Sequence, residues 1–293
     1  MGSVHRVIVG NGVEEARKQA VTKHERAVVE AAHQVLSDEA DKVGFTYSGF
    51  ALTCLPHKLQ DEDVWRREGH NLTMVLQSGV NRAGDSLGLP YGSYARFILL
   101  FLQSEAVKKG SREIELGRSM RVWLGQLGLS IGGKTYRMVN EQARRISGCS
   151  LTFFADRGSK EIMRRGGFVD GSITMTDVLS DQPGLWQDRV LLNEEFYRAL
   201  RDHPVPLSES ALRAIGPRSA VIDIYVWLAY RLHALTRDVE TGLPWRAGLF
   251  SAWTRLARWG SCPANRRAGS GVRSGPHPRL CAQQRPCGRP DCP

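Results

Sequence analysis

One glycine-rich segment near the middle of the chain carries a pattern that could bind a nucleotide. Gly128-Leu-Ser-Ile-Gly-Gly-Lys-Thr135 matches G-x-x-x-x-G-K-[ST], the P-loop, in which backbone N–H groups cradle phosphates. P-loop chemistry also needs a buried strand before the loop and a carboxylate on a second strand to hold magnesium. The residues before Gly128 instead have helical spacing, and the best match to an apolar strand ending in a carboxylate, Ser219-Ala-Val-Ile-Asp223, lies in an apolar helical stretch. We therefore interpret the glycines as a turn, with a P-loop NTPase kept as an alternative.

The segment that follows, Lys134–Ser147, is predicted to be a helix with one apolar and one basic side. Its apolar side is expected to face the core and consists of Tyr136, Val139, Ala143 and Ile146. Its outward side is expected to consist of Lys134, Arg137, Glu141, Arg144 and Arg145. Arginine and lysine contact DNA phosphates, and arginine also binds guanine through two hydrogen bonds. A solvated face held by charge pairs fits less well, because only Glu141 balances the four cations.

Further basic side chains flank this helix on both sides. Arg118 and Arg121 lie in the preceding predicted helix, Arg118–Leu127. The predicted polar loop Asp156–Gly167 is expected to form a wing, and its cations are Arg157, Lys160, Arg164 and Arg165. Residues 94–165 hold fourteen basic and six acidic residues, whereas the chain as a whole carries a formal charge of +10. This local excess of positive charge is typical of a nucleic-acid-binding surface.

The order of predicted elements around the basic helix is that of a winged helix-turn-helix, whose third helix enters the major groove. A helix (Tyr94–Lys109), a strand (Arg112–Leu116) and the helix Arg118–Leu127 come before it, and the strands Cys149–Ala155 and Phe168–Met175 follow it. Upstream we expect a helix over 14–36, strands at Phe45–Leu55 and Asn71–Gln77 joined by the charged stretch Asp61–Glu68, and a linker at Ser78–Gly92. Downstream we expect a strand (Gln187–Leu192), a helix (Glu194–Asp202), a stiff turn at His203-Pro-Val-Pro206, and helices at Ser208–Ile215 and Arg218–Leu235.

Other function classes find little support in the sequence. No apolar run is long enough to cross a membrane and Met1–Gly12 has no signal-peptide pattern, so a cytoplasmic protein without membrane contact is expected. No His-x-His or Gly-x-Ser-x-Gly motif is present, so we expect no enzyme, no catalytic residue and no cofactor. Cys54-x-x-His57 has the spacing of metal ligands but no second pair nearby, so we expect no metal.

Several motifs together resemble plasmid RepA-type replication initiators, from about residue 30 to about residue 246. The motifs are Phe45-Thr-Tyr-Ser-Gly-Phe50, Leu55-Pro-His57, Pro90-Tyr-Gly-Ser93, Ser111-Arg-Glu-Ile-Glu-Leu-Gly-Arg-Ser119, Gly132-Gly-Lys-Thr-Tyr136, Glu141-Gln-Ala-Arg-Arg-Ile146, His203-Pro-Val-Pro206 and Trp227-Leu-Ala-Tyr-Arg-Leu-His233. The resemblance implies binding to repeated double-stranded sites at a plasmid origin, local duplex opening, and recruitment of the host replication initiator and helicase. Self-association is a further possibility. A winged-helix transcriptional repressor would share the same DNA-binding chemistry and stays an alternative.

The C-terminus departs from the family pattern. Residues 246–293 contain nine arginines, one acidic residue, and no Lys, Glu, Ile, Met or Tyr. We interpret this stretch as a frameshifted or diverged end, with a functional arginine-rich tail as the alternative. The expected fold is therefore α+β, with two winged-helix modules, the second incomplete, and a disordered tail. The expected boundaries are 1–92 for an N-terminal helix and strand region, 93–180 for the first module, 181–246 for the second, and 247–293 for the tail.

Overall fold

The computed structural model describes residues 3–37, 42–69, 71–129, 132–157, 160–170 and 189–233. The chain divides into two compact units, Met1–Ala252 and Trp253–Pro293, and the second lies wholly outside the described residues. The described helices are α1 (Ser3–Asn11), α2 (Val13–Gln19), α3 (Lys23–Leu36), α4 (Gly49–Leu52), α5 (Gly92–Lys109), α6 (Gly117–Gln126), α7 (Gly133–Gly148), α8 (Glu194–Asp202), α9 (Glu209–Ile215) and α10 (Ser219–His233). The described strands are β1 (Val43–Tyr47), β2 (Val64–Glu68), β3 (Leu72–Gln77), β4 (Glu113–Glu115), β5 (Ser150–Arg157), β6 (Lys160–Gly167), β7 (Arg189–Leu191) and β8 (Pro204–Ser208).

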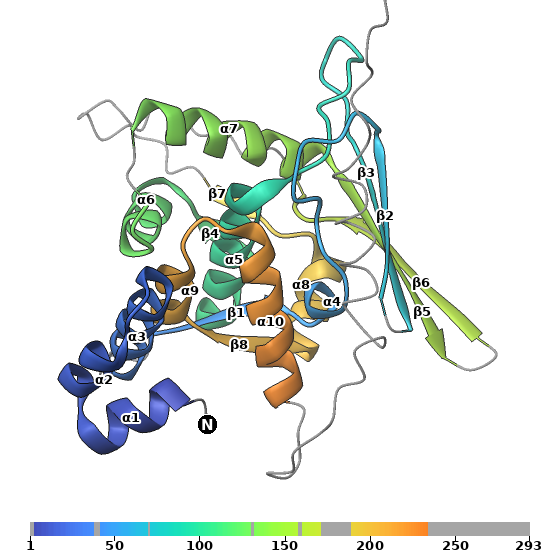
Figure 1. Cartoon of the computed structure of the whole chain (residues 1–293). Helices are drawn as coiled ribbons and strands as arrows, with labels where there is room; N and C mark the ends of the chain where they lie inside the picture. The colour runs from blue at the N-terminus through green and yellow to red at the C-terminus, as the bar shows by residue number, and fades with distance from the viewer. Residues whose placement is uncertain are drawn as a thin grey trace, which may run out of the picture. The chain divides into compact units, whose positions relative to one another are not determined.

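Helix α5 forms the centre of the main core. Its residues from Ala95 to Ser104 are all buried, because the helix is apolar on every side and other elements surround it. It contacts α6, α7, α8, α10, β1 and β4, as Figure 1 shows for the neighbouring ribbons. Gly110 ends it in the left-handed conformation, with φ of 62°, a geometry that glycine adopts without steric cost.

Three antiparallel sheets pack around this helix. The largest has the order β2-β3-β5-β6, and the pairs β1-β8 and β4-β7 form the other two. Strand β3 comes from the region 1–92 and pairs with β5, while β1 pairs with β8 from the region 181–246. The regions that the sequence predicts as separate therefore contribute strands to the same sheets. The described helices include none long and apolar enough to cross a membrane.

The N-terminal part differs from the sequence prediction in three places. The helix expected over 14–36 is interrupted: α2 ends at Gln19, and Thr22 starts α3 through a capping box with Glu25. The strand expected over Phe45–Leu55 stops at Tyr47 and is followed by the short helix α4. The charged stretch expected to be a connector contains strand β2, which pairs with β3.

Three predictions about the C-terminal half are also wrong. The loop expected over Asp156–Gly167 is largely strand β6, which pairs with β5 from Arg157↔Lys160 to Ser150↔Gly167. The strand expected from Phe168 reduces to a bridge between Val169 and Leu192, and residues 171–175 lie outside the described residues. The turn expected over His203–Pro206 contains strand β8. Prolines are tolerated there because a two-stranded sheet consists only of edge strands.

Helix α10, whose apolar sequence is typical of a helix buried on all sides, is buried on one side only. Ile222, Asp223 and Val226 are buried, whereas Leu228 and Leu232 are 42% and 67% exposed. The order α5-β4-α6-α7-β5 follows the predicted one, but the second strand of the hairpin is β6 in place of Phe168–Met175, and β4 pairs with β7 rather than with the hairpin.

Candidate nucleic-acid interface

Helix α7 lies along the outside of the core (Figure 1), and its exposed residues include several cations. Val139, Gln142, Ala143 and Ile146 are buried, and the last three side chains lie within one turn of one another. The prediction that Val139, Ala143 and Ile146 face the core is confirmed, and Tyr136 is half-buried. Because this side is fixed, the opposite side points to solvent.

The solvent side of α7 carries three exposed cations. Lys134 lies in the first turn, Arg137 one turn further on, and Arg144 near the far end of the helix. The Nε atom of Arg137 donates to the carbonyl of Gly133 at 3.3 Å, and the rest of its guanidinium group keeps donors available. We call this set, Lys134, Arg137 and Arg144, the α7 basic face. Its spacing covers the length of the helix, which suits contact along a DNA backbone.

Arg145 does not belong to this face, and the helical-wheel prediction that placed it outward is wrong. Its side chain is only 13% exposed and donates to Glu141 Oε1 at 2.8 Å and to the Leu89 carbonyl at 3.1 Å. Its guanidinium group also lies 5.2 Å from the ring centroid of Tyr91. Arg145 and Glu141 therefore hold α7 against the segment before α5, and neither is free to lie in a groove.

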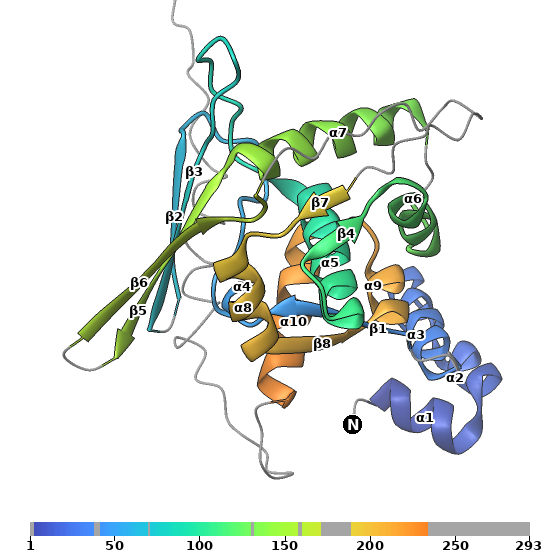
Figure 2. The same ribbon diagram turned by 180° about the vertical axis from the view of Figure 1, so that it is seen from behind.

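The remaining predicted cations divide between the hairpin and helix α6. Arg164 and Arg165 are exposed, but they lie within strand β6 opposite Phe153 and Thr152, not in a loop. Arg157 and Lys160 form the last pair of the hairpin, and Arg118 and Arg121 lie on α6. Figures 1 and 2 show the hairpin leading away from α7, so its tip lies at the far end of the sheet. The structure thus does not bring the hairpin tip together with the α7 basic face.

The P-loop-like segment has a helix where a P-loop needs a strand. Helix α6 ends at Gln126, Gly128 follows with φ of 75°, and α7 starts at Gly133. Asp223, the carboxylate considered for magnesium, lies in helix α10 and is bound by Arg96. Both departures favour the interpretation of the glycines as a turn before a helix.

The part of the chain that contains α7 matches a known protein family. Residues 89–245, more than half of the chain, match the model of the family described as plasmid-encoded RepA protein. The chain belongs to this family. The matched part of this RepA-family chain runs from just before α5 past the end of α10, and so contains the whole α7 basic face. The resemblance in the sequence motifs is thereby confirmed.

The comparison with curated proteins found no match. Among solved structures, one titled "Crystal structure of SeMet derivatives of domain2 and domain 3 of RctB" matches with a TM-score of 0.41 and 12% identity, covering 75% of this chain and 86% of that chain.

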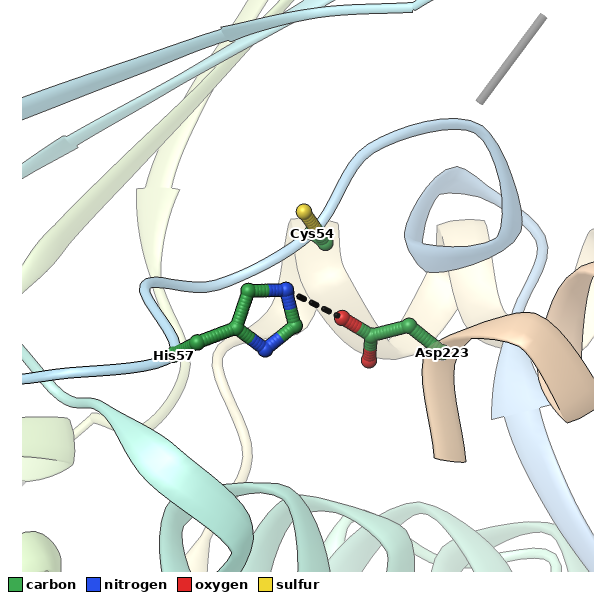
Figure 3. Close-up of side chains that lie close together, drawn as sticks. All are labelled: Cys54, His57 and Asp223. Atoms are coloured by element: carbon green, nitrogen blue, oxygen red, sulfur yellow. Dashed lines mark ion pairs between the residues drawn. The ribbon is translucent and has the colours of Figure 1, made fainter. Parts of the chain in front are cut away.

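A cluster that the sequence did not reveal lies where Arg96 of α5 contacts Asp223 of α10. The side chains of Cys54, His57 and Asp223 come within 4.8 Å of one another, and these residue types can bind metals (Figure 3). Cys54-x-x-His57 supplied only two of the three members, and Asp223 comes from a distant helix. An ionisable residue in each of two apolar helices, Arg96 and Asp223, is the signal that could have identified a buried ion pair.

The chemistry of this cluster fits an ion-pair network better than a metal site. Arg96 donates from Nε and Nη2 to the two oxygens of Asp223, both at 2.7 Å, and Nη2 lies 3.3 Å from His57 Nδ1. Arginine only donates, and the Ser219 hydroxyl, 3.1 Å from Nδ1, can donate as well, so we assign Nδ1 as an acceptor. The proton of a neutral ring is then on Nε2, which lies 3.6 Å from Asp223 Oδ2. In this tautomer Nε2 carries the proton and offers no lone pair to a metal.

The protonation states of the cluster agree with this assignment. Burial, reinforced by the neighbouring Arg96, lowers the pKa of His57, and the Asp223 charge opposes that shift only in part. Burial also raises the pKa of the Cys54 thiol to about 11, so the thiolate that binds metals is disfavoured. Arg96 further donates to the carbonyls of Leu55, Pro56 and Gly92. The network joins α5, α10 and the segment after α4.

Proposed function

We propose that this chain is a plasmid replication initiator that binds duplex DNA through the α7 basic face. The observation that carries the proposal is the arrangement of α7, whose buried side is packed on the core while Lys134, Arg137 and Arg144 point outward, and the part of the chain that the structure describes places no carboxylate in an ion pair with them. In this proposal α5, α6 and α7 act as the three helices of a winged-helix module, and α7 enters the major groove. Membership in the RepA family supports the choice of an origin as the target.

The further steps of initiation are inferred from the family resemblance. We infer that the chain binds repeated sites at a plasmid origin, promotes local opening of the duplex, and recruits the host initiator and helicase. No residue is assigned to these steps. A footprint with permanganate on a supercoiled origin plasmid distinguishes an initiator, which exposes unpaired thymines, from a transcriptional repressor, which leaves the duplex closed.

Binding through the α7 basic face is tested by the salt dependence of affinity. Each phosphate contact contributes a slope of about −0.9 in a plot of log affinity against log salt. Lys134→Ala should weaken binding to every duplex sequence and make the slope shallower by about one. The measurement is fluorescence anisotropy with a labelled duplex at several salt concentrations. Equal slopes for wild type and variant would show that Lys134 does not contact a DNA phosphate.

The same variant tests the nucleotide-binding alternative. In a P-loop, Lys134 contacts the β- and γ-phosphates, so Lys134→Ala would abolish ATP binding and leave duplex affinity unchanged. ATP turnover by the wild-type chain that disappears in Lys134→Ala would overturn our proposal. The matched control is Arg201→Ala, which removes one exposed cation from α8.

A further inference from the structure

The loop between β3 and α5, Ser78–Tyr91, is packed directly against helix α7. Its Gly79 lies so close to Gly148 at the end of α7 that a Cβ atom on Gly79 would lie 2.1 Å from the Gly148 carbonyl oxygen. The Tyr91 N–H donates to Gln142 Oε1 at 2.8 Å, and Arg145 donates to the Leu89 carbonyl. The loop and the helix are thus joined at three separate places, so the loop is positioned by α7 rather than independently of it.

The outer part of this loop is held by its own hydrogen bonds. Asn81 Oδ1 accepts from the N–H groups of Ala83 and Asp85, at 2.8 and 2.9 Å, and the Asn81 N–H donates to the Asp85 carbonyl at 2.8 Å. Leu87 donates to the Gly79 carbonyl at 2.9 Å, which closes the base. A loop with this many internal bonds loses less conformational entropy on binding than a free chain.

The tip of the loop presents Arg82. The side chain is exposed, and within the described part of the chain no acceptor or carboxylate holds it. The neighbouring carboxylate of Asp85 already accepts from Asn81 Nδ2 at 3.0 Å. Arg82 is therefore a cation on a fixed support with its donors available.

The loop, unlike the β5–β6 hairpin, lies beside the C-terminal end of α7. Figures 1 and 2 both show it projecting beyond the C-terminal end of α7, whereas the β5–β6 hairpin extends toward the opposite end of the sheet. A DNA duplex lying along the outer side of α7 would pass this loop with the phosphates that flank the groove. A long cationic side chain at this point reaches the backbone, where half or more of protein–DNA hydrogen bonds are made.

We propose that the Ser78–Tyr91 loop is a second DNA-binding element, in which Arg82 contacts a backbone phosphate beside the groove occupied by α7. The inference rests on the proposed DNA-binding function and adds a site to it. The loop takes the place of the wing that the sequence assigned to residues 156–167. Its contact is with the phosphate and so is independent of base sequence.

The test is the salt slope of binding to a random-sequence duplex for four proteins: the full chain, Arg82→Ala, Arg82→Lys and Arg201→Ala. One lost phosphate contact makes the slope shallower by about 0.9, so the advantage of the wild type over Arg82→Ala should shrink about 3.5-fold between 50 and 200 mM salt. Arg82→Lys should keep the wild-type slope, because lysine also contacts phosphate. Arg201→Ala, an exposed cation on α8, should keep it too.

Hydroxyl-radical footprinting on a duplex with a single bound site gives an independent readout. Arg82→Ala should lose protection at one flank of the footprint and keep the centre. If Arg82→Ala matches Arg201→Ala in both measurements while Lys134→Ala loses slope, the loop inference is wrong and the α7 assignment stands. If the wild-type chain binds no duplex at all, both fail together.

Discussion

Two adjacent arginines on α7 should respond to substitution in opposite ways. Arg144 is exposed and belongs to the α7 basic face, whereas Arg145 is directed inward and contacts Leu89, Tyr91 and Glu141. Arg144→Ala should reduce DNA affinity and leave the free energy of unfolding within about 0.5 kcal/mol of wild type. Arg145→Ala should do the reverse. Sequence alone treats the two residues alike.

The expected cost of Arg145→Ala follows from the contacts that are lost. The charged hydrogen bond to the buried Leu89 carbonyl contributes about 1.5–3 kcal/mol, the contact with the Tyr91 ring about 0.5–1 kcal/mol, and the i,i+4 pair with Glu141 about 0.3–0.5 kcal/mol. Arg145 Nε is buried without a hydrogen-bond acceptor among the described residues, and its desolvation offsets part of the gain. We expect a loss of about 2–3 kcal/mol.

Urea unfolding and duplex binding, measured on the same preparations, separate the two effects. The urea midpoint of Arg145→Ala should fall while the m-value stays unchanged, because the same surface is exposed on unfolding. Its affinity, corrected for the folded fraction, should keep the wild-type salt slope. The reasoning is refuted if Arg145→Ala keeps wild-type stability and loses salt slope, since Arg145 would then contact DNA and not the loop.

Three further predictions concern the interface and the buried network. Arg137→Ala should reduce the preference for an origin repeat over a scrambled duplex by about 1–3 kcal/mol, if Arg137 contacts a base; an equal loss on both duplexes in a competition assay would show a phosphate contact instead. Arg96→Met leaves the buried Asp223 carboxylate unpaired and should cost about 3–5 kcal/mol in urea unfolding, and the double variant with Asp223→Leu should recover most of that loss; a single variant within 1 kcal/mol of wild type would contradict the network. Because the pKa of His57 is lowered below 6.5 in the folded chain, the unfolded state binds the proton more readily, so the free energy of unfolding should fall as the pH drops below about 6.5. His57→Gln should show a smaller fall between pH 7 and 5.5, and an identical pH dependence in the two proteins would count against a neutral buried ring.

The helices were predictable from sequence because their apolar spacing is set by burial on one core. Glu194–Asp202 was predicted to the residue, and Tyr94–Lys109 differs from α5 by two residues at one end. Their ends carry local signals: Asn193 caps α8 through its side chain, and Gly110 ends α5. For such elements the tertiary structure and the local preference agree, so single-sequence reasoning suffices.

Two strands that the sequence does not predict, β2 and β6, are the two edges of the four-stranded sheet. Edge strands commonly carry charged side chains, which oppose pairing with other chains, and here they contain Arg66 and Arg67 or Arg164 and Arg165. Charge in a segment therefore indicated a connector or a wing where the structure has a strand. Strand β8, predicted to be a turn from Pro204 and Pro206, was missed for the related reason that only an edge accommodates proline.

The candidate site shows the same division between local and tertiary information. A glycine pair followed by lysine exposes backbone N–H groups beside a cation, and this geometry suits any phosphate, whether of a nucleotide or of a DNA backbone. The pattern around Lys134 therefore predicts phosphate binding but not its class. The class depends on the element ahead of it, and helix α6 ahead of Gly128 favours the DNA backbone, because a nucleotide cradle is built on the end of a strand. The inward turn of Arg145 depends on the loop that ends at Tyr91, 54 positions away in the sequence, and no helical periodicity carries that information.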